Sequence, residues 1–495
     1  MVVIQQHDKK TKMITKEEHD GILYNITRSI CPTCKTAIDA QIIVREQKVF
    51  MRKRCLEHGW FESLLSSDFS FYRDAEKFNK PGTIPFEFQT EIKEGCPSDC
   101  GLCSEHKQHT CLALLEITTK CNMSCPVCFA GTGDRKGGHL HLETIENMIS
   151  TLQRAEGTVE IVQLSGGEPT LHPDFFEILR KLRDADVKTI MINSNGRKFA
   201  SSLEFCQKVR KNAERVNIYL QFDGFEESTY RTLRGNPVLI EEKLQAIKNL
   251  NQSGIKVTLV MTVVQGINDQ EIGSVVRFLH EQEGVSGLIL QPLFPEGRLK
   301  IEYDPLDHLT LPDIIDKIVE QTEQLYNKDD FFPIPCPYPH CSACTFSYHD
   351  PETREFTTIK RLVDVEEYLD FFKNSALPGV EAVVKDTLED LLSFSTVPGT
   401  KDLVEGYCQA CGIEFSFNAV QDSLQKYLKH VKLITIKPFQ SAWDMDIKRL
   451  MKCCIHEVLP DGRIIPFCAY NAIYREKFDL SSYYSANSEE RERKE

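Results

Sequence analysis

Apolar runs alternate with helical patterns along the middle third of the chain. Six runs carry apolar residues on both faces, which is typical of strands buried on both sides; they cover 112–118, 159–164, 189–193, 216–222, 257–264 and 288–293. Between them, apolar residues recur at helical spacing within 145–152, 175–182, 240–250 and 272–280. This alternation predicts a parallel sheet with crossover helices. Six units are too few for a closed eight-stranded barrel, so we predict an α/β fold with an open, partial (βα)6 barrel.

Cysteine-bearing segments flank this barrel and divide the chain into five parts. Residues 1–75 are predicted to form a small mononuclear-metal module, and 76–111 a segment that binds an auxiliary cluster. The barrel covers 112–300. The C-terminal region, 301–480, contains more cysteines and predicted helices at 311–325, 363–372 and 380–392. Residues 481–495 are charged and are predicted to be a disordered tail.

Composition narrows the class of protein. The 495 residues include 19 cysteines, most of them two or three residues apart, which is the spacing of metal ligands. A formal net charge of -14 makes nucleic acid an unexpected partner, because nucleic-acid binders usually carry a basic surface. The first 20 residues lack the apolar segment of a signal peptide, and no run is long enough to span a membrane. We therefore expect a cytoplasmic protein.

Three cysteines, Cys121, Cys125 and Cys128, lie on one short loop after the first strand. Such a triplet can hold three irons of a [4Fe-4S] cube and leave the fourth iron open for a ligand. The sequence Leu-Ser-Gly-Gly-Glu-Pro follows at 164–169, where the second strand ends. Together the two motifs resemble the radical S-adenosylmethionine (SAM) superfamily. The alternatives are a zinc site for the cysteines and an ordinary turn for the glycines.

The resemblance implies that SAM binds the open iron and is split to a 5'-deoxyadenosyl radical. It implies that Gly166 and Gly167 let the backbone approach the methionyl amine and that Glu168 places a negative charge beside it. It also implies a low-potential electron donor of the ferredoxin or flavodoxin type. Further SAM contacts are expected at later strand ends, where capping or turn roles are the alternative. The candidates for these contacts are Asn193, Asn195, Asp223 and Val264.

Other cysteine groups predict further metal sites. One group precedes the first strand and could ligate a complete auxiliary [4Fe-4S] cluster, with zinc as the alternative: it consists of Cys96, Cys100, Cys103 and Cys111. The N-terminal group has the spacing of a tetrahedral site for Zn²⁺ or a single iron: it consists of Cys31, Cys34, Cys55 and His58.

The C-terminal cysteines predict at least one more cluster. Cys336, Cys341 and Cys344 can supply three ligands from one loop, and a fourth would come from Cys454 or Cys468. The pattern assigns no role to Cys408, Cys411 and Cys453. Cys206 lies in a helical pattern and is interpreted as a core residue.

The order of all these motifs, from about residue 25 to 475, resembles the tetraether (membrane-spanning) lipid synthases, a radical SAM family earlier described as dihydropterin methylases. This resemblance implies carbon–carbon coupling between two lipid alkyl chain ends, two auxiliary clusters and peripheral contact with a membrane. Three alternatives remain: a radical SAM C-methylase of a pterin-like small molecule, a radical SAM peptide-modifying enzyme, and an electron-transfer protein without SAM turnover.

Overall fold

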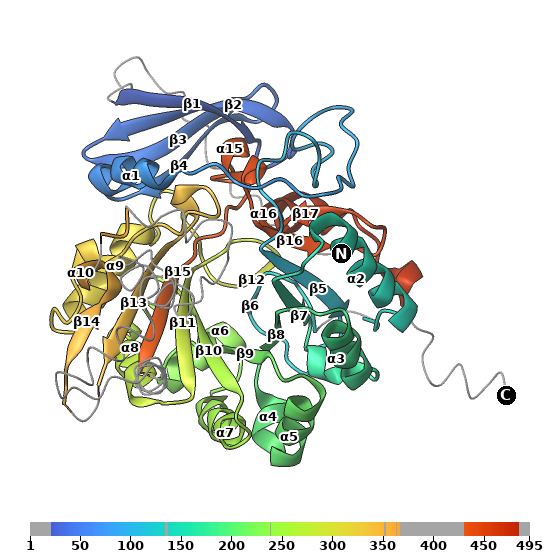
Figure 1. Ribbon diagram of the computed structural model, residues 1–495. Coiled ribbons are helices and arrows are strands. Elements are labelled where there is room, and N and C mark those ends of the chain that lie inside the picture. Colours follow the sequence, from blue (N-terminus) through green and yellow to red (C-terminus); the bar gives the residue numbers. More distant parts are fainter. Residues whose placement is uncertain are drawn as a thin grey trace, which may run out of the picture.

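The computed structural model describes residues 21–133, 137–237, 239–350, 353–362, 364–366 and 430–484. A small N-terminal sheet lies over one end of a much larger sheet (Figure 1). None of the helices in these ranges is long and apolar enough to cross a membrane.

The N-terminal sheet is an antiparallel ribbon of four strands in sequence order. Its strands are β1 (Ile22–Ile30), β2 (Ala37–Arg45), β3 (Lys48–Cys55) and β4 (Gly59–Ser66). A short helix, α1 (Phe69–Ala75), follows and begins at Asp68, whose side chain accepts a hydrogen bond from the Phe71 backbone N–H. The predicted metal ligands lie at the two turns that join β1 to β2 and β3 to β4, with Cys55 as the last residue of β3.

The six predicted strands are confirmed, and each pairs in parallel with the next. They are β5 (Leu112–Thr118), β7 (Ile161–Gly166), β8 (Thr189–Ser194), β9 (Val216–Gln221), β10 (Lys256–Val263) and β11 (Val285–Pro292). The predicted crossover helices are also present, as α2 (Leu142–Glu156), α3 (Phe175–Asp184), α7 (Leu239–Gln252) and α8 (Ile272–Glu281). Shorter helices join them: α4 (Arg197–Ser201), α5 (Leu203–Asn212) and α6 (Glu227–Arg234).

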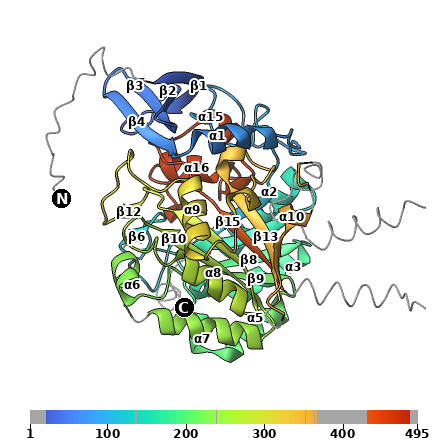
Figure 2. The same cartoon turned by 90° about the vertical axis from the view of Figure 1, so that its left-hand side faces the viewer.

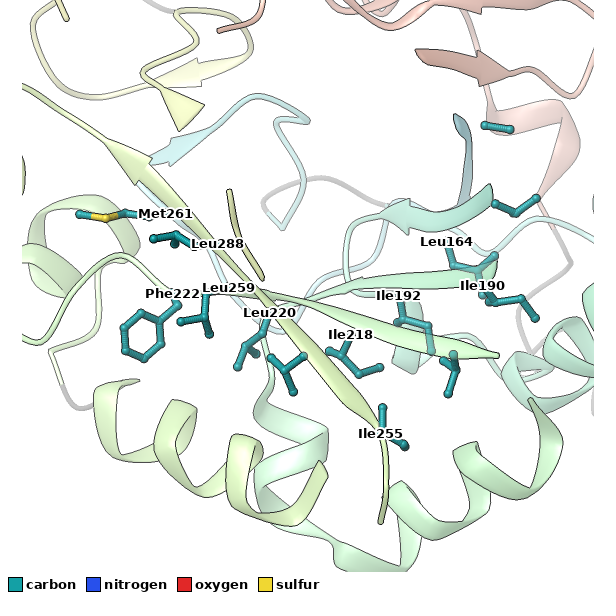
Figure 3. Close-up of a cluster of buried hydrophobic side chains, with 14 of the residues drawn as sticks. Leu164, Ile190, Ile192, Ile218, Leu220, Phe222, Ile255, Leu259, Met261 and Leu288 are labelled. Carbon is teal, nitrogen blue, oxygen red and sulfur yellow. The ribbon is translucent and has the colours of Figure 1, made fainter. Parts of the chain in front are cut away.

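Apolar side chains between the strands and these helices form the main core. Figure 3 shows Ile218, Leu220 and Leu259 on the strand face that is turned toward the helices. All three side chains are completely buried. The helical spacing of apolar residues was therefore a correct guide to which face of each helix packs on the sheet.

Segments from the C-terminal region extend the parallel sheet at both edges, which the sequence pattern did not predict. β16 (Ile455–Val458) pairs in parallel with β5, and β15 (Val431–Ile436) pairs in parallel with β11. Antiparallel strands complete an 11-stranded sheet: β13 (Ala343–His349), β14 (Phe356–Thr358) and β17 (Ile464–Pro466). The barrel is thus completed by residues far along the chain.

The remaining C-terminal predictions concern helices and the tail. The helix expected at 311–325 is α9 (Leu311–Gln321). The helices expected at 363–372 and 380–392 fall, apart from 364–366, outside the described residues, as do Cys408 and Cys411. The first residues of the expected tail are ordered, because Tyr484 Oη and Thr119 Oγ1 are hydrogen-bonded at 3.0 Å. Residues 485–495 lie outside the described part.

Candidate active site

A cavity lies inside the partial barrel, between the cysteine loop and the C-terminal segments. Cys121, Cys125 and Cys128 line it on one side. Cys336 and Cys454 line another part of its wall. The same cavity therefore connects the predicted SAM cluster with a second group of cysteines.

The cysteine loop is held by backbone contacts from a distant segment. β6 (Val127–Cys128) pairs with β12 (Arg298–Leu299). The Arg298 guanidinium donates to the carbonyl oxygens of Cys125, at 2.7 Å, and Thr132, at 2.6 Å. These bonds hold the loop in the cavity wall.

The thiols fit a metal cluster. Burial raises the pKa of Cys121 to about 12 and also raises the pKa of Cys125, so their thiolate forms need a nearby positive charge. Iron would supply that positive charge and stabilise the thiolates. The sets of ligand atoms that lie within 4.8 Å of one another in the described residues do not include this triplet. Its wider spacing suits a cube of iron and sulfide better than a single ion.

Gly166 and Gly167 pack directly against the cysteine loop. A Cβ on Gly166 would lie 2.1 Å from the Thr118 carbonyl oxygen, and one on Gly167 would lie 2.1 Å from the Lys120 carbonyl oxygen. Gly166 also has φ +113°, a conformation that favours glycine. Both glycines line the cavity, so their small size serves the loop contact as well as the predicted approach of a ligand.

The Glu168 carboxylate is buried and hydrogen-bonded to neighbouring residues. Its side chain does not line the cavity and is only 1% exposed. It accepts hydrogen bonds from Thr170 Oγ1 (2.7 Å), Ser194 Oγ (2.9 Å) and the Asn195 backbone N–H (2.8 Å). These bonds join the ends of β7 and β8 through the carboxylate, and its place beside the SAM amine stays a prediction.

The four strand-end candidates divide into two pairs. Asn193 and Asn195 line the cavity, and Asn195 Nδ2 donates to Asn122 Oδ1 at 2.7 Å. Asp223 and Val264 do not line it, and their contacts with SAM stay predictions. Asp223 is fully buried in an ion pair, and Val264 packs in a small apolar cluster behind the loop.

Arg234, the partner of Asp223, is a site residue that sequence reasoning missed. It lines the cavity, and its guanidinium nitrogens lie 2.6 and 2.8 Å from the Asp223 carboxylate. Another guanidinium N–H donates to the Val127 carbonyl oxygen at 3.0 Å. Burial by itself would lower the pKa of Arg234, but Asp223 raises it above the usual value. No motif marks this arginine, which is the last residue of α6.

The N-terminal metal ligands come together as predicted. The ligand atoms of Cys31, Cys34, Cys55 and His58 all lie within 4.8 Å of one another. His58 Nδ1 is 3.5 Å from Cys55 Sγ and 3.7 Å from Cys31 Sγ. Three thiols and one imidazole at this spacing suit a single tetrahedral ion.

Cys111 joins a different group from the one predicted. It lies with Cys336 and Cys454, all within 4.8 Å, and Cys111 Sγ is 2.6 Å from Cys336 Sγ. The reason is the pairing of β5 with β16, in which the Cys111 backbone N–H donates to the Cys454 carbonyl oxygen at 3.0 Å. The remaining cysteines of the first auxiliary group surround a separate small pocket: they are Cys96, Cys100 and Cys103.

The predicted C-terminal triplet is also separated by the fold. Cys344 lies in an apolar cluster with Phe332 and Phe346, so it is a core residue and not a ligand beside Cys336. Cys341 Sγ lies 3.4 Å from the Arg449 guanidinium nitrogen that donates to it. Cys468 Sγ accepts a hydrogen bond from the Gln440 backbone N–H at 3.3 Å. Cys206 is completely buried in the main core, as predicted.

Polar side chains from four separate strands line the cavity together with apolar ones. They are Gln163 on β7, Tyr219 on β9, Gln291 on β11 and Thr435 on β15. Among the described residues, none of these side chains has a hydrogen-bond partner. The cavity therefore offers donors and acceptors that a bound molecule could use.

Two family models match the chain. The radical SAM superfamily model matches residues 115–279, and the model of the HMPTM N-terminal zinc ribbon domain matches 23–67. The superfamily match implies SAM and a [4Fe-4S] cluster as cofactors, and the cysteine groups described above fit additional clusters and the ribbon metal. The ribbon model favours zinc at the N-terminal site.

Two similar proteins match part of the chain. The solved structure of SuiB from Streptococcus suis bound to SAM has 17% identity and a TM-score of 0.36, and the match covers 44% of this chain and 48% of SuiB. A probable GTP 3',8-cyclase of Pyrococcus horikoshii is 31% identical over 177 residues, or 35% of this chain and 54% of that protein.

One relative matches almost the full length. The 7,8-dihydro-6-hydroxymethylpterin dimethyltransferase of Methanocaldococcus jannaschii is 31% identical over an alignment of 493 residues. The match covers 92% of this chain and 94% of the relative. The match therefore includes the ribbon, the barrel and the C-terminal cysteines. The chain belongs to the radical SAM superfamily, and within it to the family of this archaeal protein.

Proposed function

We propose that this radical SAM enzyme methylates a carbon of a flat, nitrogen-rich heterocycle of the pterin class. The observation that carries the proposal is the set of four unpartnered polar side chains inside the cavity. The substrate named for the full-length archaeal relative supports the same class of molecule.

An energetic argument favours a polar ring over a plain alkyl chain. Leaving a buried polar group without a partner costs about 1–3 kcal/mol. The edge of a pterin carries N–H donors and oxygen and nitrogen acceptors, which amide side chains such as Gln163 and Gln291 can pair with. An alkyl chain in the same place would leave these groups unpaired.

The surrounding residues have distinct tasks. When bound, the cluster and SAM supply a 5'-deoxyadenosyl radical that can remove hydrogen from an unactivated carbon. Arg298 and Arg234 hold the cysteine loop that presents this chemistry to the cavity. Met191 and Ile289 line the cavity and exclude water from a reactive carbon. A low-potential electron donor is required for each radical formed.

A second candidate function is carbon–carbon coupling of two lipid alkyl chain ends, with peripheral membrane contact. One observation favours it, namely an aromatic wall of the cavity. Phe294, Phe439 and Phe467 line the cavity and contact one another, with ring centroids 4.5–6.2 Å apart. Such a wall suits a long apolar tail.

Product analysis separates the two candidates. The enzyme, reconstituted without oxygen, is incubated with SAM, dithionite and 7,8-dihydro-6-hydroxymethylpterin. We expect a methylated pterin with one S-adenosylhomocysteine, from the SAM that donates the methyl group, and one 5'-deoxyadenosine with methionine, from the SAM whose radical removes the hydrogen. Dithionite supplies the two electrons. Coupling would instead yield two 5'-deoxyadenosines for each bond formed between lipid chains, with the pterin unchanged, and this result would overturn the proposal.

The cavity variant Gln163→Leu sharpens this test. It keeps the size of the side chain but removes the amide, so we expect binding of the pterin to weaken by about tenfold, since one good hydrogen bond is lost. SAM cleavage in the absence of substrate should persist. Unchanged pterin affinity would contradict the assigned role of the polar set.

A further inference from the structure

The N-terminal ribbon is anchored to the cavity wall by a buried polar face. Its inward side chains include Thr27, Lys53 and Ser63, which are 5, 1 and 0% exposed. A lysine so deeply buried requires partners that replace water. Each of the three side chains has a partner on one C-terminal loop, residues 437–446, and Lys53 Nζ also donates to Ser29 Oγ at 3.0 Å.

Three hydrogen bonds join the ribbon to this loop. Lys53 Nζ donates to the Ala442 carbonyl oxygen at 2.8 Å, and Ser63 Oγ donates to the Trp443 carbonyl oxygen at 2.9 Å. Thr27 Oγ1 donates to Asp446 Oδ1 at 2.6 Å. The helix that continues the loop, α15 (Ile447–Met451), lies beside the ribbon in both Figure 1 and Figure 2.

The other side of the loop forms part of the cavity. Phe439 lines it and contacts Phe467, with 4.5 Å between ring centroids. Lys437 lines it as well. Gln440 donates its backbone N–H to Cys468. A shift of the loop would therefore move the cavity wall.

The metal ligands of the ribbon lie next to the residues that hold the loop. Cys55 follows Lys53 by two residues on β3. Cys31 directly follows Ile30, which packs in the same apolar cluster as the cavity residues Leu114 and Phe467. Small metal modules generally need their metal in order to fold. Loss of the ion would disturb the face that binds the loop.

We propose that the metal in the ribbon fixes loop 437–446 and thereby controls the affinity of the cavity for its substrate. Lys53 acts as a positioning residue in this arrangement, because it contacts the loop and not the substrate. The inference does not depend on which substrate the enzyme uses.

The chain offers a direct probe, because it contains 2 tryptophans: Trp60 in the ribbon and Trp443 in the loop. In a Trp60→Phe background, the emission of Trp443 alone reports the loop. We expect Cys34→Ser, which removes one metal ligand, to shift this emission and to weaken binding of 7,8-dihydro-6-hydroxymethylpterin by about fivefold, equivalent to about 1 kcal/mol. Lys53→Met should cause the same changes while the ribbon keeps its metal.

A matched control is Lys48→Met, an exposed lysine of the same strand, which should leave emission, affinity and metal content unchanged. SAM cleavage without substrate should be the same in Lys53→Met as in the parent. If Cys34→Ser does not fold, Lys53→Met still tests the contact through which the ribbon would fix the loop, on which the inference depends. Unchanged Trp443 emission and pterin affinity in Lys53→Met would overturn the inference. A shifted emission in a protein that never binds the pterin would support it and reject only the proposed substrate.

Discussion

Arg234 connects the cysteine loop to the barrel through one buried ion pair. Its partner Asp223 is fully buried, and the loop carbonyl of Val127 accepts from the same guanidinium. The sequence marked Asp223 as a candidate SAM contact, because it follows a strand, but did not predict its ion pair with Arg234. The arginine is distant along the chain and carries no motif, so only the fold reveals the pair.

Arg234→Met should destabilise the protein by about 3 kcal/mol, because it leaves a buried carboxylate without a partner. Chemical denaturation would measure this loss, and iron analysis should show less metal at the loop. Arg231→Met, at an exposed position of the same helix, is the control and should change neither. A stable variant with full iron would contradict the role of the pair.

Cys125→Ala tests the loop itself. It should abolish formation of 5'-deoxyadenosine from SAM, because the cube needs all three thiolates to leave one iron open. Metal at the ribbon, which is separate in the fold, should remain. Normal 5'-deoxyadenosine formation, measured by chromatography after reduction with dithionite, would refute the assignment.

At the scale of secondary structure, local periodicity predicted the elements whose formation depends on residues close together in the sequence. The six strands and four crossover helices follow from apolar spacing within short windows. The placement of β15 and β16 depends on which distant segments pair, and short windows contain no such information. Cys111 illustrates the consequence: its spacing suggested a site with Cys103, but the pairing of β5 with β16 places it beside Cys454.

The pairing of β5 with β16 also encloses a pair of carboxyl groups, Glu116 and Glu457. Arg475 forms an ion pair with Glu116 at 2.6 Å, while Glu457 Oε1 is buried without a partner among the described residues. Burial raises the pKa of Glu457 well above its usual value near 4.5, and Glu116 raises it further. The folded chain therefore holds a proton that the unfolded chain releases above about pH 4.5.

It follows that the contribution of Glu457 to stability is complete below its unfolded pKa and is lost as the pH rises toward its folded pKa. Glu457→Gln removes this titration, so its free energy of unfolding should fall less than that of the parent as the pH rises above about 4.5. Denaturant titrations at several pH values would show this. Glu476→Gln, at an exposed position, should behave like the parent; a parental pH profile in Glu457→Gln would reject the argument.

At the scale of the whole molecule, the fold brings two cysteine groups to one cavity and leaves four polar side chains within it. The composition and motifs were sufficient to predict the superfamily and the presence of several metal sites. The substrate could not be read from them, because Gln163, Tyr219, Gln291 and Thr435 come from four separate strands. Their convergence in the fold is what supports the proposal of a polar ring over an alkyl chain.

Hydrogen transfer tests the central proposal most directly. The reconstituted enzyme is given SAM, dithionite and 7,8-dihydro-6-hydroxymethylpterin that carries deuterium at its ring and hydroxymethyl carbons, and the 5'-deoxyadenosine is analysed by mass spectrometry. The account predicts deuterium in the 5'-deoxyadenosine together with a methylated pterin. Deuterium that arrives only from a labelled lipid chain, with the pterin intact, would contradict it.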